Sequence, residues 1–306
     1  MLGYTIKMNR RSSPVIGIIL VASIATIISI YYYSSSLISP FIRKVDKFRI
    51  KKMYPSKEGA REWFVDMDNP FDDNLFYSTF NNNITRQDDG SWRIGGPAVR
   101  LNIITPLRAE LWKNVEITGY AEIVGTVSSA NNNSNNDNNN EEENHNYTKD
   151  LDWRARGGRH NSKNPCEGTS LIGTIDIDGN VRWKKEIWHT GGYTDARDTK
   201  KATDSILGRW IGWKVVMYNI NNDRGVKMES YLDNKNNNNW RKVTDLVDNG
   251  GWYAKSSDKE FYSANCGKAK DYIITNGGSI VTFRSDDIIW DFKNLSVREI
   301  QSPEHR

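Results

Sequence analysis

Three short clusters in the middle of the chain contain the residues best suited to chemistry or ligand binding. The first, Trp153-Arg-Ala-Arg-Gly-Gly-Arg-His160, places Arg154, Arg156 and His160 on one face if it forms a strand, because strand side chains alternate between faces. Cationic groups so close together repel one another unless an anion lies over them, and an arginine fork fits a carboxylate. The cluster predicts either a site for a uronic-acid carboxylate or an internal ion-pair network.

The second cluster, Lys184-Lys-Glu-Ile-Trp-His-Thr-Gly-Gly-Tyr193, combines cations, an indole and an imidazole. In strand geometry Lys185 and His189 share one face and Trp188 lies on the other. The Gly-Gly turn that follows would leave His189 near a rim. An exposed tryptophan face at such a rim can stack on a sugar ring.

The third cluster is Trp213-Lys-Val-Val-Met-Tyr-Asn219, in which Lys214 and Tyr218 share a face. The elements expected to position all three clusters are strands, because runs rich in Val, Ile, Tyr and Trp alternate in polarity between Gly, Asn and Asp turns. The clearest runs are Ala98–Ile104, Val115–Thr126, Leu171–Ile177, Val181–Trp188, Trp210–Ile220, Val226–Leu232, Ile280–Arg284 and Leu295–Ile300. They predict an all-β fold, a single antiparallel jelly-roll β-sandwich.

An arginine strand, a histidine strand and a Lys-x-x-x-Tyr strand, in this order on a jelly roll, resemble the concanavalin A-like lectin/glucanase superfamily, and within it the alginate-lyase-like polysaccharide lyases. The resemblance implies that Arg154 or Arg156 neutralises a uronate carboxylate. It also implies that His189 acts as base, Tyr218 as proton donor and Lys214 as a subsite cation in β-elimination.

The sequence departs from those lyases at three points. The arginine strand lacks its glutamate, Ile187 stands where an amide should precede His189, and Val216 replaces a glycine. The amide would share the substrate carboxylate, so elimination is poorly supported without it. The E-x-D-x-E strand of retaining glucanases is also absent, since the nearest run, Thr174–Asp178, lacks both outer glutamates.

The Asp178-Gly179-Asn180 sequence predicts a hairpin turn. One hypothesis for this turn is a calcium site, in which Asp176, Asp178 and Asn180 supply oxygen ligands. The alternative is an ordinary turn without metal, and no other cofactor is expected. Cys166 and Cys266 either close a disulfide loop or remain two buried thiols.

The N-terminal 52 residues differ in composition from the rest of the chain. Residues 15–33 form a nearly unbroken apolar run of 19 residues, long enough for a membrane-spanning helix. A buried core helix or a cleaved signal peptide is the alternative, but flanking cations and the absence of a clear small-x-small site favour a signal anchor. We expect a tail, anchor and basic juxtamembrane segment over 1–52, and a sandwich over 53–306 outside the cytoplasm.

Charge excludes one class of partner. The net charge is +4, but residues 1–52 carry nine Lys+Arg and one acid, so the remainder is slightly acidic. Nucleic-acid binding is therefore not expected, and the juxtamembrane cations suit anionic lipid head groups of a bilayer. The Asn-rich segment at about 129–148 predicts a disordered insertion between strands.

Together these features predict a membrane-anchored domain that binds a polysaccharide through Arg154, Arg156, His160, Lys185, Trp188 and Lys214. One alternative is a lyase that acts on an acidic glycan through His189, Tyr218 and Arg156. The other is a structural or adhesive envelope protein without a sugar site.

Overall fold

The computed structural model describes residues 44–79, 83–127, 149–158, 163–254 and 266–303. The chain divides into two units, Met1–Lys52 and Met53–Arg306. The predicted membrane helix and the predicted Asn-rich insertion both lie outside the described residues. Within the described residues, no helix is long and apolar enough to cross a membrane.

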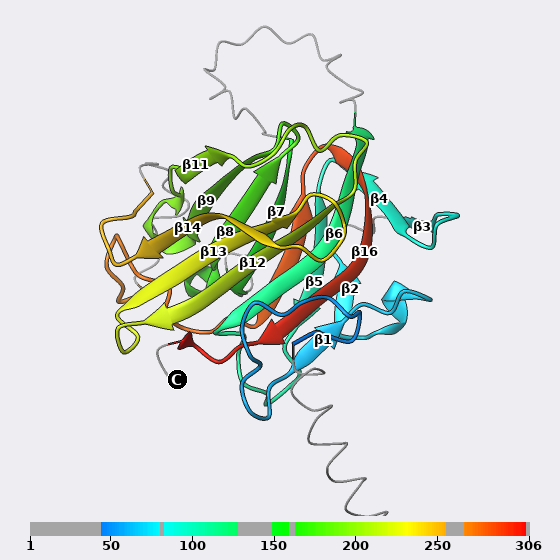
Figure 1. The fold of residues 1–306 in the computed structure, drawn as a ribbon. Coiled ribbons are helices and arrows are strands. Elements are labelled where there is room, and N and C mark those ends of the chain that lie inside the picture. Colours follow the sequence, from blue (N-terminus) through cyan, green and yellow to red (C-terminus); the bar gives the residue numbers. More distant parts are fainter. Residues whose placement is uncertain (1–43, 80–82, 128–148, 159–162, 255–265, 304–306) are drawn as a thin grey trace, which may run out of the picture. The chain divides into compact units, whose positions relative to one another are not determined.

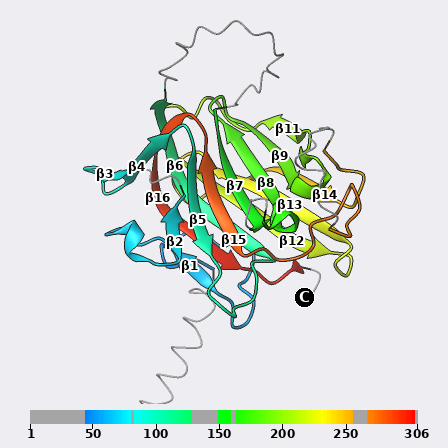
Figure 2. The same ribbon diagram turned by 180° about the vertical axis from the view of Figure 1, so that it is seen from behind.

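The second unit is a sandwich of two antiparallel sheets, which confirms the all-β prediction. In sheet A the order is β14 (Arg241–Asp248), β13 (Gly225–Asp233), β12 (Ile211–Ile220), β6 (Val115–Thr126), β16 (Ile288–Glu299), β4 (Trp92–Gly96) and β3 (Ile84–Arg86), with β1 (Glu62–Phe64) paired to β16. Figure 1 shows the sandwich with sheet A in front, and Figure 2 shows it from the opposite side, with sheet B in front.

In sheet B the order is β10 (Gly192–Tyr193), β9 (Asn180–Ile187), β8 (Thr169–Asp176), β7 (Asp150–Gly157), β15 (Ile280–Ser285), β5 (Val99–Ile104) and β2 (Phe76–Ser78), with β11 (Arg197–Lys201) paired to β9. Three short 3-10 turns complete the described elements: η1 (Pro70–Asp72), η2 (Pro165–Glu167) and η3 (Trp188–Thr190). The sequence missed β14 because Arg241, Lys242 and Asp245 of this strand are charged and exposed, which weakens the hydrophobic pattern.

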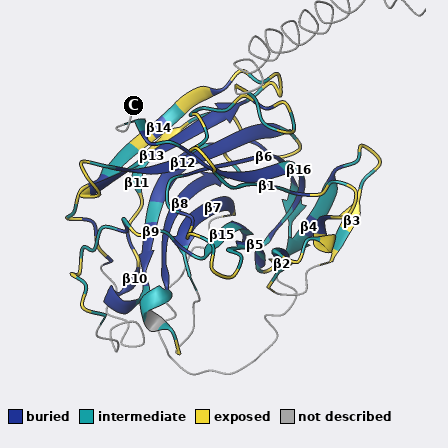
Figure 3. Ribbon diagram, turned by 90° about the horizontal axis from the view of Figure 1, so that it is seen from below, coloured by how far each residue is buried: buried dark blue, intermediate teal, exposed yellow. Residues whose placement is uncertain are grey.

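Large aromatic rings join the two sheets. Trp153 of β7 lies 4.6 Å from Trp213 of β12 and 5.1 Å from Phe283 of β15, measured between ring centroids. Gly173 of β8 also lets the two sheets approach, since a Cβ there would lie 2.6 Å from Val215 of β12. Figure 3 shows both layers coloured by burial, with the central strands mostly buried. The inward half of each alternating strand therefore forms the core.

A disulfide bond joins Cys166 of η2 to Cys266, with the two Cα atoms 5.5 Å apart and a sequence separation of 100 residues. Of the two states that the sequence left open, the structure thus has the disulfide. The bond ties the β7–β8 connection to the segment that leads into β15.

Candidate functional site

A groove lies on the face of sheet B that points away from sheet A. Trp153 faces Trp213 in the core, so the alternation of β7 turns Asp152 and Arg154 to the opposite side. The groove has a volume of about 510 Å³ and is lined by residues of β2, β5, β15, β7, β8, β9 and β10. We call it the sheet B groove.

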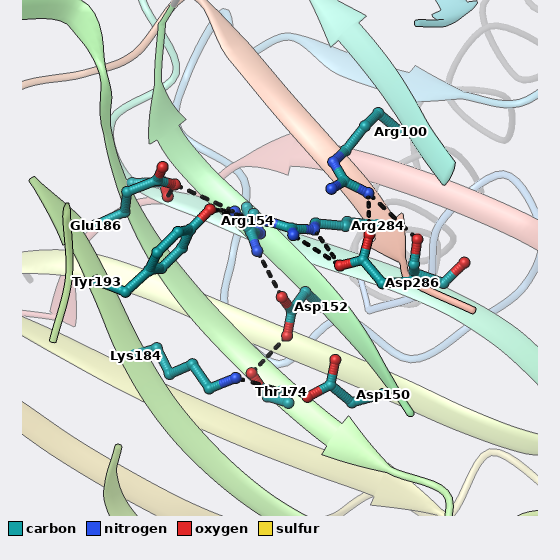
Figure 4. Close-up of polar contacts among 12 residues, drawn as sticks. Arg100, Asp150, Asp152, Arg154, Thr174, Lys184, Glu186, Tyr193, Arg284 and Asp286 are labelled. Atoms are coloured by element: carbon teal, nitrogen blue, oxygen red, sulfur yellow. Dashed lines mark hydrogen bonds and ion pairs between the residues drawn. The ribbon is translucent and has the colours of Figure 1, made fainter. Parts of the chain in front are cut away.

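Arg154 is the centre of an ion-pair network at the base of the groove (Figure 4). Its Nη2 donates to Asp152 Oδ2 at 2.6 Å, and its Nη1 donates to Glu186 Oε2 at 3.2 Å. Both carboxylates also accept a hydrogen bond from a hydroxyl group: Thr174 donates to Asp152 at 2.6 Å, and Ser170 donates to Glu186 at 3.1 Å. The guanidinium is therefore fixed in one orientation.

Two further arginines extend this network across β15 and β5. Arg284 donates from Nε to Asp286 Oδ2 at 2.7 Å, and Arg100 donates from Nη1 to Asp286 Oδ1 at 2.7 Å. The hydroxyl of Tyr193 links the two halves, because it accepts from Arg284 at 2.9 Å and from Arg154 at 3.4 Å. One continuous set of hydrogen bonds thus runs from β9 to β5.

Electrostatic interactions hold Asp152 and Arg154 in their charged forms. Burial by itself would raise the pKa of Asp152, but Arg154 and Lys184 outweigh burial and bring that pKa below its usual value. Burial also opposes the charge of Arg154, yet Tyr193, Asp152 and Glu186 raise its pKa above the ordinary arginine value. Asp152 and Arg154 are therefore ionised at neutral pH.

Aromatic rings and uncharged polar groups complete the groove. Tyr193 is 44% exposed and Tyr77 of β2 is 39% exposed, and both line the groove together with Trp188. Thr282 donates to Asn102 at 2.8 Å, and Asn102 donates to Thr79 at 2.6 Å. Partly exposed aromatic side chains beside fixed donors and acceptors suit a polyhydroxylated ligand such as a sugar.

Arg156 lies on the other side of the sheet, so the expectation that it shares a face with Arg154 is wrong. Its φ of 63° and a register shift between Ile280 and Thr282 mark a bulge that reverses the side-chain alternation. The guanidinium donates to Asn219 at 2.5 Å and to the carbonyl of Ile274 at 2.6 Å. Burial lowers the pKa of Arg156 to about 9.

The two predicted ligand lysines are both buried in ion pairs. Lys185 points inward and its Nζ lies 2.9 Å from Asp248 Oδ2, with both side chains fully buried. Lys214 is on the outer face of sheet A, where its Nζ lies 2.8 Å from Glu116 and 2.9 Å from Thr118. Neither lysine lines the sheet B groove.

His189 belongs to η3 and not to a continued strand, because β9 ends at Ile187. The imidazole is 5% exposed, and neither ring nitrogen has a hydrogen-bond partner among the residues the structure describes. Burial, with a smaller effect of Lys268, lowers the pKa of His189. Trp188, one residue earlier, lines the groove together with Glu186 and Tyr193 of the same cluster.

Tyr218 shares the outer face of sheet A with Lys214, as predicted. Its hydroxyl lies 3.5 Å from that of Tyr54, which donates to Glu229 at 2.5 Å. Burial, and the hydrogen bond that its hydroxyl donates to Tyr54, raise the pKa of Tyr218. Since Arg154 faces outward from sheet B, the structure does not bring Tyr218 together with the arginine cluster. His160 lies outside the described residues.

The candidate calcium ligands form a turn. The carboxylate of Asp176 accepts the backbone N–H of Asn180 at 2.9 Å and the guanidinium of Arg182 at 2.8 Å. Across the described ranges, no group of three or more His, Cys, Asp or Glu residues is placed to hold a metal ion.

Sequence reasoning missed several groove residues. Arg284 ends a run that was predicted as a strand but was not assigned to a site, although alternation along Ile280–Ser285 puts Thr282 and Arg284 on one face. Arg100 carries the same signal in β5, where it pairs in register with Arg284. Only the pairing of β15 between β5 and β7 shows that these side chains join Arg154.

Comparison with known proteins gives similarity at the level of solved structures only. No protein-family profile matches the chain, and no curated protein matches its sequence. Winged bean acidic lectin, solved with methyl-alpha-D-galactose, is 7% identical, with 79% of this chain and 100% of the lectin covered and a TM-score of 0.39. A galectin-like protein of unknown function from Bacillus subtilis is 9% identical, with coverages of 82% and 100% and a TM-score of 0.40. A putative glycosyl hydrolase from Parabacteroides distasonis is 12% identical, with coverages of 71% and 83% and a TM-score of 0.34.

Proposed function

We propose that this protein binds carbohydrate in the sheet B groove. The observation that carries the proposal is the combination of two exposed tyrosine rings, Tyr77 and Tyr193, with a fixed network of donors and acceptors between them. A sugar ring presents an apolar face to an aromatic ring and hydroxyl groups to polar side chains. Fixed side chains lower the entropic cost of binding, because little ordering remains to be done.

A chain of several sugar units fits the groove better than one. A second hollow, of about 920 Å³, shares Tyr77, Gly157, Gly158 and Ile280 with the sheet B groove. The two hollows therefore adjoin, and an oligosaccharide could extend from one into the other. This supports a polysaccharide as the natural ligand.

We also propose that the sandwich is held outside the cytoplasm by a membrane anchor over residues 15–33. The apolar run in the sequence and the Cys166–Cys266 disulfide support this location, because disulfides persist in oxidising compartments. Protease digestion of intact cells tests it. Degradation of the sandwich without lysis is expected, whereas protection until lysis would contradict the proposed orientation.

The binding proposal is tested by affinity electrophoresis of the full-length protein in gels that contain different polysaccharides. Tyr193→Ala removes an exposed ring from the groove and should weaken binding at least about tenfold, since removing an aromatic anchor typically costs more than about 1.4 kcal/mol. The matched control is Tyr253→Ala, because Tyr253 is 42% exposed and does not line the groove.

Equal retention of wild type and Tyr193→Ala on every polysaccharide would reject the groove as the binding site. Tyr193→Phe then separates the ring from the hydroxyl that accepts from Arg154 and Arg284. The same mixtures, followed in the ultraviolet for unsaturated products, test the lyase alternative.

A further inference from the structure

The ionised groups of the sheet B groove balance one another. Three guanidinium groups meet three carboxylates in the network, namely Arg100, Arg154 and Arg284 with Asp152, Glu186 and Asp286. The adjoining group on β7, β8 and β9 is balanced as well, because Arg182 and Lys184 pair with Asp150 and Asp176. These ten side chains, all among the described residues, therefore carry many charges but no net charge.

Each guanidinium already holds a carboxylate of the protein itself. Arg284 directs both Nε and Nη2 to Asp286 Oδ2, each at 2.7 Å. Arg154 divides its two terminal nitrogens between Asp152 and Glu186. A sugar carboxylate could use the fork of either arginine only by displacing one of these acids.

Displacement is costly because the protein carboxylates are buried. The side chain of Glu186 is 1% exposed, that of Asp152 is 5% exposed and that of Asp286 is 12% exposed. Removing the cation from such a group leaves an uncompensated charge in a poorly solvated place. An incoming anion would also be repelled by the displaced acid.

Uncharged hydroxyl groups suit the same surface well. A hydroxyl both donates and accepts, so it can donate to a groove carboxylate and accept from a groove cation without disturbing their charge balance. The Thr282–Asn102–Thr79 chain offers further neutral partners along β15, β5 and β2. We propose that the groove binds uncharged saccharides and discriminates against uronic-acid and sulfated glycans.

This inference rests on the proposed carbohydrate-binding function and narrows its ligand class. The test compares retention of the full-length protein in gels containing neutral polymers, dextran and β-glucan, with gels containing the acidic polymers alginate and polygalacturonate. Salt is kept at about 0.15 M, where the screening length is about 8 Å and distant surface charges contribute little. Retention by a neutral polymer, with the acidic polymers bound at least about tenfold more weakly, is the expected result.

Two substitutions change the charge of the groove with little change of shape. Glu186→Gln keeps an oxygen for Ser170 but leaves Arg154 with one acid fewer, so it should weaken neutral binding and strengthen retention by alginate, each severalfold. Asp286→Asn makes the corresponding change beside Arg284 and serves if the first variant does not fold. The control is Glu110→Gln, which alters net charge equally at an exposed site outside the groove.

The outcomes separate the inference from the function on which it rests. Stronger wild-type retention by alginate than by every neutral polymer, lost in Tyr193→Ala, would overturn the inference and leave the binding function intact. Unchanged selectivity in both Glu186→Gln and Asp286→Asn would overturn it too. Retention by no polymer of either class would overturn the proposed function itself.

Discussion

Replacing Lys185 by methionine tests whether this lysine stabilises the core or contacts a ligand. Its Nζ lies 2.9 Å from Asp248 Oδ2 and 3.0 Å from the carbonyl of Tyr272, and 5.2 Å from the ring centroid of Trp252. Lys185 belongs to β9 in sheet B and Asp248 to β14 in sheet A, so the pair connects the two sheets. Lys185→Met leaves the Asp248 carboxylate buried without its cation.

The expected loss follows from the burial of both partners. Each side chain has 0% exposure, so water cannot take over the role of the missing ammonium. Removing one partner of such a pair typically costs about 3–5 kcal/mol, a large fraction of the roughly 5–15 kcal/mol that stabilises a folded domain. With a urea slope of about 1–3 kcal/mol per molar, the unfolding midpoint should fall by on the order of 1–5 M.

Urea unfolding followed by tryptophan fluorescence measures this change, and affinity electrophoresis measures binding by the folded protein. Lys185→Met should unfold at much lower urea with unchanged glycan retention, because Lys185 does not line the sheet B groove. The double variant Lys185→Met/Asp248→Leu should recover most of the loss, since an apolar pair can replace a buried ion pair. An unchanged midpoint together with weakened glycan binding would refute the burial argument and make Lys185 a ligand residue.

Three further predictions concern the sandwich. The disulfide closes a loop of 100 residues. Replacing both Cys166 and Cys266 by serine should therefore lower the free energy of unfolding, measured in urea, by up to roughly 4–5 kcal/mol. A reduced protein as stable as the oxidised protein would contradict this. Gly278→Ala should destabilise by about 1–3 kcal/mol, since its Cβ would lie 2.4 Å from a backbone nitrogen, whereas Gly125→Ala, with no atom within 4 Å, should not. Asp152 has a lowered pKa in the folded state, so its contribution is complete above the unfolded pKa of about 3.9 and is lost at lower pH. The stability gap between wild type and Asp152→Asn should therefore narrow as the pH falls below about 4, and a constant gap would contradict the assigned ion pair.

The sheet B groove combines high charge with order, and its ion pairs are the reason. Arg154 is held by two acids that also accept hydrogen bonds from hydroxyl groups, Asp152 from Thr174 and Glu186 from Ser170. Binding sites gain selectivity when their polar groups are fixed before the ligand arrives. The proposed selectivity for uncharged saccharides depends on this pairing of charges.

The sequence by itself determined the class of fold, because its signals are local. Alternating runs rich in Val, Ile and Trp identified most of the long strands, and Lys214 and Tyr218 do share a face of β12 as the alternation predicted. Arg154, which the sequence also singled out, lines the sheet B groove. Two-residue periodicity depends only on neighbouring residues, so it can be read without knowing the fold.

Tertiary structure decided which side chains meet. The bulge at Arg156 turns that guanidinium away from Arg154, and the placement of β12 in sheet A puts Tyr218 on the face opposite the groove. Arg284 and Arg100 join the site only because β15 pairs with both β7 and β5. Strand order, bulges and ion-pair partners arise from contacts between residues far apart in the chain. The spacing of residues along the sequence does not predict those contacts.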